Sequence, residues 1–232
     1  MARRVVVALL GPVAWTPPGI DPARWRTALA EDVVDLLATL HEVEIAVAVT
    51  PEDRWLADAV VWPGTAVHEV AEPTVNAVFT ALSRAAAPGT GAGPGEDVAS
   101  ADTAAPARTG GTSSGGYDQA AVVVADAPDV PGLTLGKLLR PLSSRPVAVA
   151  PVEGDGPGLL GVAARLPVPG WLPALDVDTA VPADLRAAAP RPGDVAVTAG
   201  WRRLRGPADL ATLDPAFEGW EATRALLSGQ PG

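Results

Sequence analysis

Residues 120–131 read Ala-Ala-Val-Val-Val-Ala-Asp-Ala-Pro-Asp-Val-Pro, a run of small and β-branched residues that ends in two acids and two prolines. A strand that is apolar along its whole length is typical of a sheet covered on both faces. We therefore predict a buried strand at 120–125. It leads directly into a loop that carries Asp126 and Asp129.

Similar apolar runs recur along the chain and alternate with helical patterns. We predict further strands at 5–10, 44–49 and 146–150, a weak one at 60–62 and a short one at 159–162. Helix starts are expected at Pro22, with Asp21 as the N-cap, and at Pro73, Pro182 and Pro207. Strands that alternate with helices predict an α/β fold: a mainly parallel, doubly wound, Rossmann-like sheet with helices on both faces.

The length of 232 residues favours a single domain, 1–232, with one unusual segment. Residues 87–116 consist almost entirely of Ala, Gly, Pro, Ser and Thr with a few acids, and Val98 is their only large apolar residue. Such a composition buries too little surface to order itself. We predict a flexible low-complexity insertion.

Composition excludes several classes of function. The chain has no cysteine, so disulfides, thiolate nucleophiles and Cys-ligated metals are excluded, and a cytoplasmic location is expected. A formal net charge of −10 argues against nucleic acids and anionic membranes as partners, because both need clustered Lys and Arg. No apolar stretch is long enough to cross a bilayer. The oligomeric state stays open.

Asp126 and Asp129 are the first candidates for a functional site. In an open α/β sheet, ligands bind at the carboxyl ends of the strands, where Asp126 is expected. Hard cations such as Mg²⁺ or Mn²⁺ take carboxylate oxygens together with ligand phosphates, so the loop suits a metal-diphosphate. Alternatively, both acids cap the turn and the next helix. Replacing Asp126 would then cost only about 1 kcal/mol for a lost cap or turn bond.

Three motifs in order resemble a small bacterial family of GT-A-type glycosyltransferases. That family carries Asp-Ser-Pro-Asp-Leu-Pro, then Asp-Gly-Gly-Tyr with Leu-Gly, then Asp-Val-Asp-Thr with Asp-Leu. The matching stretches here are residues 126–131, Asp155-Gly156 with 159–161, and 176–179 with Asp184-Leu185. The match covers about the second half of the ordered chain.

The resemblance implies a GT-A-type fold and transfer from a nucleotide-activated small molecule. It implies that Asp126 binds the metal, Mg²⁺ or Mn²⁺, and the nucleotide diphosphate, supported by Asp129. The metal would act as a Lewis acid on the leaving diphosphate. Asp155 would face the acceptor as the catalytic acid or base, although an Asp-Gly turn explains it equally well.

Two departures from the family pattern keep other functions open. The family has a Lys-Thr-Arg-Leu-like motif after the first strand, whereas residues 11–18 of this chain hold no cation. Pro157 also replaces the second glycine of the Asp-Gly-Gly-Tyr motif. A non-catalytic GT-A-fold interaction or regulatory module is one alternative. A nucleotidyltransferase of the guanylyltransferase type is another. The basic cluster Arg202, Arg203 and Arg205 is expected to form a salt-bridged surface.

Overall fold

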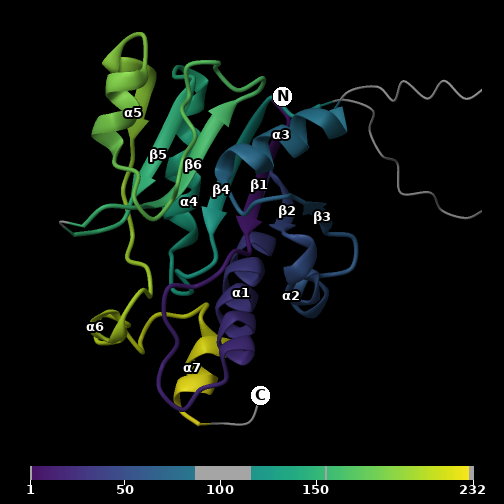
Figure 1. Ribbon diagram of the computed structural model, residues 1–232, viewed down its shortest axis with the longest axis vertical. Helices are drawn as coiled ribbons and strands as arrows, with labels where there is room; N and C mark the ends of the chain where they lie inside the picture. Colours follow the sequence, from purple (N-terminus) through teal and green to yellow (C-terminus); the bar gives the residue numbers. More distant parts are fainter. Residues whose placement is uncertain (1, 87–115, 155, 230–232) are drawn as a thin grey trace, which may run out of the picture.

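The computed structural model describes residues 2–86, 116–154 and 156–229 (Figure 1). Its strands are β1 (Arg4–Leu9), β2 (Glu44–Val49), β3 (Ala66–Glu69), β4 (Gln119–Val124), β5 (Val147–Pro151), β6 (Leu159–Arg165) and β7 (Val195–Val197). The α-helices are α1 (Pro22–Ala38), α2 (Arg54–Val60), α3 (Val75–Ala86), α4 (Gly132–Leu139), α5 (Pro182–Ala188), α6 (Pro207–Leu210) and α7 (Glu221–Leu227). Short 3-10 turns occupy Pro51–Asp53, Arg140–Ser143 and Pro192–Asp194.

The described strands form one sheet in the order β3-β2-β1-β4-β6-β5-β7. β1 pairs in parallel with β2 and β4, β2 with β3, and β5 with β7. Only β6 runs the other way, antiparallel to both β4 and β5. The predicted mainly parallel sheet is thereby confirmed, and the carboxyl ends of β1, β2, β4 and β5 share one edge.

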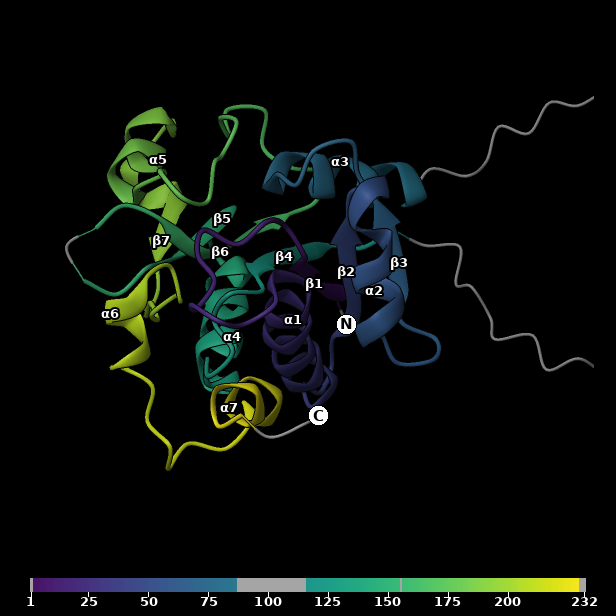
Figure 2. The ribbon, with the colours of Figure 1, turned by 60° about the horizontal axis from the view of Figure 1, so that its bottom comes forward.

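Helices cover both faces of this sheet, as predicted (Figure 2). Buried side chains of α1, α2 and α4 pack on one face, where alternate residues such as Val6 and Val123 point. α3 and α5 pack on the other face, against Val5, Val122 and their neighbours. Every side chain of β4 is buried, which explains why its sequence is apolar without alternation.

The C-terminal part of the chain covers the carboxyl edge of the sheet. In Figure 1 α6 and α7 lie at the end towards which β1 and β4 point, with α7 beside α1. A small separate core of Trp25, Leu29 and Leu204 joins the C-terminal part to α1. The Asp32 carboxylate of α1 also accepts the backbone N–H groups of Ala222 and Thr223, at 2.9 Å each.

Three features of the sheet differ from the predictions or extend them. The strand predicted at 60–62 is wrong, because Leu56, Ala57 and Val60 form the buried face of α2, which ends at Val60. The third strand is β3, a partly exposed edge strand that carries polar side chains. β7 was not predicted; it is a short edge strand on the opposite side of the sheet.

Gly161 of β6 lies against β4 where there is no room for a side chain. A Cβ atom at this position would lie only 2.8 Å from the carbonyl oxygen of Val122 and 2.9 Å from Cγ1 of Val123. Any larger residue would force the strands apart, so the glycine of the Leu-Leu-Gly stretch has a packing role.

Within the described residues, none of the helices combines the length and hydropathy needed to cross a membrane. The insertion predicted at 87–116 lies outside the described residues except for Gly116, so it stays a prediction.

Candidate functional site

Asp126 and Asp129 lie in the loop that follows β4, at the carboxyl edge of the sheet. Both are buried, with 3% and 5% of their surface exposed. Ala127 and Val130, also buried, anchor the loop in the core, and the N–H of Val130 donates to the carbonyl of Ala127 at 3.2 Å. The acids therefore sit at the edge that the sequence predicted, but beneath the surface.

Arg203 forms a two-pronged ion pair with Asp126. Its Nε donates to Oδ1 of Asp126 at 2.7 Å and its Nη2 to Oδ2 at 2.8 Å. Nη2 also lies 2.7 Å from Oδ1 of Asp178. Nη1 donates to the carbonyl oxygens of Val177 at 3.1 Å and Leu159 at 3.3 Å. Each nitrogen of the guanidinium thus has at least one oxygen partner.

Asp129 is held by the two residues that precede Arg203. The indole Nε1 of Trp201 donates to its Oδ1 at 3.0 Å, and Nη2 of Arg202 donates to its Oδ2. The Arg202 guanidinium also stacks 4.6 Å from the centre of the Trp201 ring. All four carboxylate oxygens of the predicted pair therefore have donors from one short segment.

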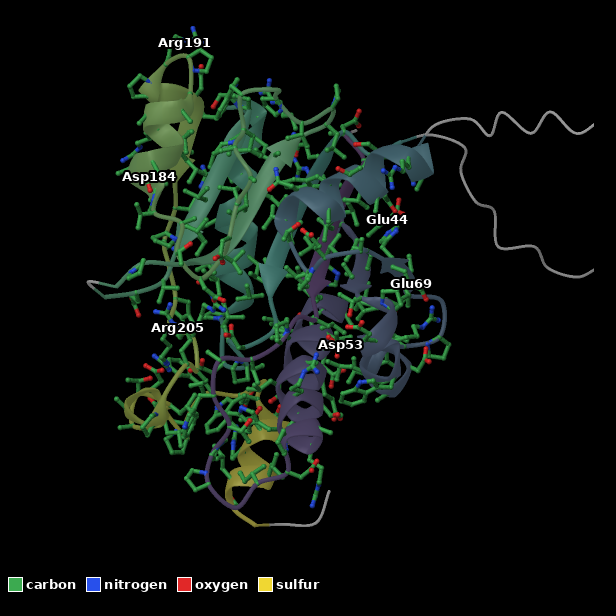
Figure 3. All side chains as sticks on the ribbon, viewed as in Figure 1. Glu44, Asp53, Glu69, Asp184, Arg191 and Arg205 are labelled. Carbon is green, nitrogen blue, oxygen red and sulfur yellow. The ribbon has the colours of Figure 1, made fainter. Side chains whose placement is uncertain are left out.

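The 201–205 segment reaches the acids because it crosses the carboxyl edge of the sheet. Trp201 forms an isolated bridge with Val152 beyond β5, and the N–H of Leu204 donates to the carbonyl of Asp126 at 2.8 Å. Arg205 lies between the end of the sheet and α6 (Figure 3), where its Nη1 donates to the carbonyl of Pro157 at 3.0 Å. The predicted salt bridges of the basic cluster exist for Arg202 and Arg203, but they are mostly buried.

A cavity of about 330 Å³ opens beside Asp126. Its walls come from the ends of β1 and β4, from the loop after β1 and from the stretch 175–178. β1 and β4 are neighbours from which the chain continues in opposite directions along the sheet, to β2 and to β5, and open α/β folds bind ligands at such a point. The charged residues that line it are Asp126, Asp176, Asp178 and Arg203.

The wall formed by the loop after β1 supplies no cation. Gly11, Pro12 and Val13 line the cavity. Arg26 of α1 reaches this loop, donating from Nη2 to the carbonyl of Gly11 at 3.3 Å, but its Nη1 pairs with Asp53 at 2.7 Å. Arg203 is therefore the only cationic side chain among the described residues that line this cavity.

The second and third motifs of the family resemblance pack together beside the cavity. Asp176 closes a turn by accepting the N–H of Asp178 at 2.8 Å and the hydroxyl of Thr179 at 3.1 Å. The carbonyl of Val177 accepts the N–H of Leu159 at 2.7 Å. Asp155 lies outside the described residues, so its predicted catalytic role is untested.

The acids in this arrangement do not fit a metal ion. Among the described residues, no group of three or more His, Cys, Asp or Glu side chains lies close enough together to hold a metal ion by itself. Both oxygens of Asp126 already face a guanidinium, and those of Asp129 face an indole N–H and a second guanidinium. The assignment of Asp126 as a metal ligand stays a prediction.

No family model matches the chain, and no curated protein matches it by sequence. Several solved structures match it in fold. A Desulfovibrio desulfuricans G20 protein assigned as a nucleotide-diphospho-sugar transferase has a TM-score of 0.55 and 13% identity, covering 98% of this chain and 96% of its own. A 4-diphosphocytidyl-2C-methyl-D-erythritol synthase from Anaerococcus prevotii DSM 20548 has a TM-score of 0.52 and 10% identity, covering 97% and 96%.

A homologue of Mycobacterium tuberculosis Rv0371c from Mycobacterium sp. strain JC1 has a TM-score of 0.51 and 13% identity, covering 97% of this chain and 95% of its own. At such identities the likeness shows the fold alone. The chain therefore shares the α/β fold of these three proteins.

Proposed function

We propose that the protein binds a nucleotide-activated small molecule in the cavity at the carboxyl ends of β1 and β4. The observation that carries the proposal is the position of this cavity, between two adjacent strands whose connections diverge. The GT-A resemblance of the three motifs, two of which border the cavity, supports the same ligand class. A cytoplasmic location stays part of this proposal.

The described lining suits the uncharged part of such a ligand best. Leu9, Val13 and Leu175 offer apolar surface for a base or a sugar ring. Asp176 and Asp178 are exposed carboxylates at its rim that can accept hydrogen bonds from sugar hydroxyls. A diphosphate would then extend towards the open side, because the lining holds more acids than cations.

Transfer of a sugar from such a donor is the activity that we propose first. Asp126 lines the cavity and would border the ligand, Asp129 would support it from outside the lining, and Asp155 would serve as acid or base on the acceptor side. A departing diphosphate needs nearby positive charge. A Mg²⁺ or Mn²⁺ ion at Asp126 would supply this charge, but only if Arg203 first left the carboxylate.

Two observations favour a second candidate, a non-catalytic module with the same fold. Both acids that would hold a metal-diphosphate are paired internally, and the loop after β1 has no basic side chain. This loop also disfavours the nucleotidyltransferase alternative, since attack on a triphosphate demands still more positive charge.

A ligand screen followed by a turnover assay tests the proposal. A ligand that binds only the native state raises its melting temperature, so nucleoside diphosphates, triphosphates and their sugar conjugates are compared with and without Mg²⁺ or Mn²⁺. We expect stabilisation by at least one of them. Binding with hydrolysis or transfer supports a transferase, whereas binding without turnover supports a non-catalytic binding module.

A matched pair of variants ties any response to the cavity. Pro12 is exposed and lines the cavity, so Pro12→Trp should fill part of it and weaken the response. Pro18 is also exposed and belongs to the same loop, but it does not line this cavity, so Pro18→Trp should leave the response intact. If no nucleotide stabilises the folded wild-type protein, the binding proposal is wrong.

A further inference from the structure

The guanidinium of Arg203 lies where a divalent cation would have to bind Asp126. The side chains of both residues are only 4% exposed, and the two guanidinium nitrogens cover both carboxylate oxygens at 2.7 and 2.8 Å. A planar guanidinium matches a carboxylate in this two-pronged geometry, which a lysine could not reproduce. The two oxygens are thus already neutralised from within the chain.

The remaining contacts of Arg203 hold this charge in place. Its Nη1 donates to the carbonyl oxygens of Val177 and Leu159, and its Nη2 faces Asp178. Burial on its own would lower the pKa of Arg203, but the hydrogen bonds and negative charges of Asp126 and Asp178 raise it above its ordinary value. The Arg203 guanidinium therefore stays charged, as arginine side chains in proteins do.

A metal ion bound to both carboxylate oxygens of Asp126 would have to displace this guanidinium. The displaced Arg203 would be left buried beside a dication, without its main counter-ion, and such an unpaired buried charge is strongly unfavourable. Asp129 offers no way round this, because Trp201 and Arg202 hold its two oxygens. Each ion pair therefore opposes metal binding at its own carboxylate.

We propose that Arg203 is the resident cation of this cavity and takes the place of a divalent metal, so that ligands bind there without metal. The role of Arg203 as the resident cation depends on the ion pairs alone. The binding of ligands without metal rests on the proposed function.

Mn²⁺ binding to the full chain tests the role of Arg203 as the resident cation. We expect the electron paramagnetic resonance signal of free Mn²⁺ to be unchanged by wild-type protein, and Mn²⁺ to leave its melting temperature unchanged. Stoichiometric Mn²⁺ uptake that is lost in Asp126→Asn would overturn the proposal, because the metal would then bind where Arg203 lies.

Arg203→Met provides a gain-of-binding test. This variant removes the guanidinium but keeps a long side chain, and it leaves Asp126 facing the space beside Asp178. We expect a lower melting temperature that Mn²⁺ partly restores, together with uptake of Mn²⁺ from solution. In the double variant Arg203→Met/Asp126→Asn the metal should have no effect.

Each outcome of this comparison decides the matter. A folded Arg203→Met protein that takes up no Mn²⁺ would show that Arg203 is merely structural, and the proposal would fall. If Arg203→Met does not fold even with Mn²⁺, the wild-type Mn²⁺ titration decides alone.

Metal-independent ligand binding is tested with any nucleotide that the screen identifies. Its affinity should be the same in EDTA and in Mn²⁺, and a large gain in affinity with Mn²⁺ would contradict metal-independent binding. If no nucleotide binds at all, the proposed function fails. The Mn²⁺ experiments would still report on Arg203, so the two failures can be told apart.

Discussion

Two regions that border the same cavity differ sharply in charge. The loop after β1 contributes Gly11, Pro12 and Val13 and contains no cation, whereas the 201–205 segment carries three arginines. Those arginines bind partners within the protein. Arg202 pairs with Asp129, Arg203 pairs with Asp126, and Arg205 donates to the carbonyl of Pro157. Among the described residues that line the cavity, the positive charge thus comes from Arg203 in the C-terminal part of the chain, and this arginine is paired with Asp126 of the acidic loop.

The difference shows that a basic cluster and an acidic loop in one sequence need not be two halves of a ligand site. Here Arg202 and Arg203 neutralise Asp129 and Asp126. The loop after β1 carries no basic side chain that could bind phosphate. A cavity lies at the carboxyl edge of the sheet, while the most buried ion pair beside it, Arg203 with Asp126, lies within the protein itself.

Breaking the Arg203 pair should have the largest effect. Asp126→Ala leaves a buried guanidinium without its main partner, so we expect a loss of about 3–5 kcal/mol in the free energy of unfolding. This exceeds the 1 kcal/mol or so expected for a turn residue, because the structure buries Asp126 and pairs it. Urea denaturation measures it; a loss below about 1 kcal/mol would contradict the pairing.

The anchor of the C-terminal part on α1 should respond to pH. Burial raises the pKa of Asp32 from 3.8 to about 6, despite the backbone N–H groups of Ala222 and Thr223 that lower it. A raised carboxyl pKa means that the folded state holds the proton more tightly, so stability is lost as pH rises through about 6.

Asp32→Asn cannot titrate at this position and provides the control. The stability of wild-type protein relative to Asp32→Asn should fall by up to about 3 kcal/mol between pH 4 and pH 7. Thermal unfolding at several pH values measures the trend. A constant difference across that range would mean that Asp32 does not titrate as described.

Replacing Arg202 should lower the free energy of unfolding less than breaking the Arg203–Asp126 pair. Arg202→Met leaves Asp129 with the indole N–H of Trp201, and the Arg202 side chain is 19% exposed, so solvent replaces part of the interaction. We expect a loss of about 1–2 kcal/mol by urea denaturation. A loss equal to that of Asp126→Ala would contradict the expectation that the Arg202–Asp129 pair stabilises the fold less than the more buried Arg203–Asp126 pair.

The sequence was sufficient to predict most of the sheet, because buried parallel strands are continuous apolar runs such as β4. The antiparallel direction of β6 could not be predicted, because the direction of a buried strand does not affect the hydropathy of its sequence. β3 was missed because its edge position leaves His68 and Glu69 on a strand without an apolar run.

At the site, the sequence placed Asp126 and Asp129 at the correct edge but not their partners. Asp126 and Arg203 are 77 positions apart, and no helical or strand spacing relates them. The one available signal was charge: the chain's only basic cluster had to meet some of its many acids. The prediction of salt bridges for that cluster was right for Arg202 and Arg203, yet it did not identify which acids would pair.

Anomalous scattering from crystals grown with Mn²⁺ and a nucleoside diphosphate tests the central claim most directly, because manganese can be located independently of the protein. Our account predicts no manganese peak between Asp126 and Asp129, with Arg203 still on both oxygens of Asp126. A manganese peak on the Asp126 carboxylate, with Arg203 displaced, would contradict it.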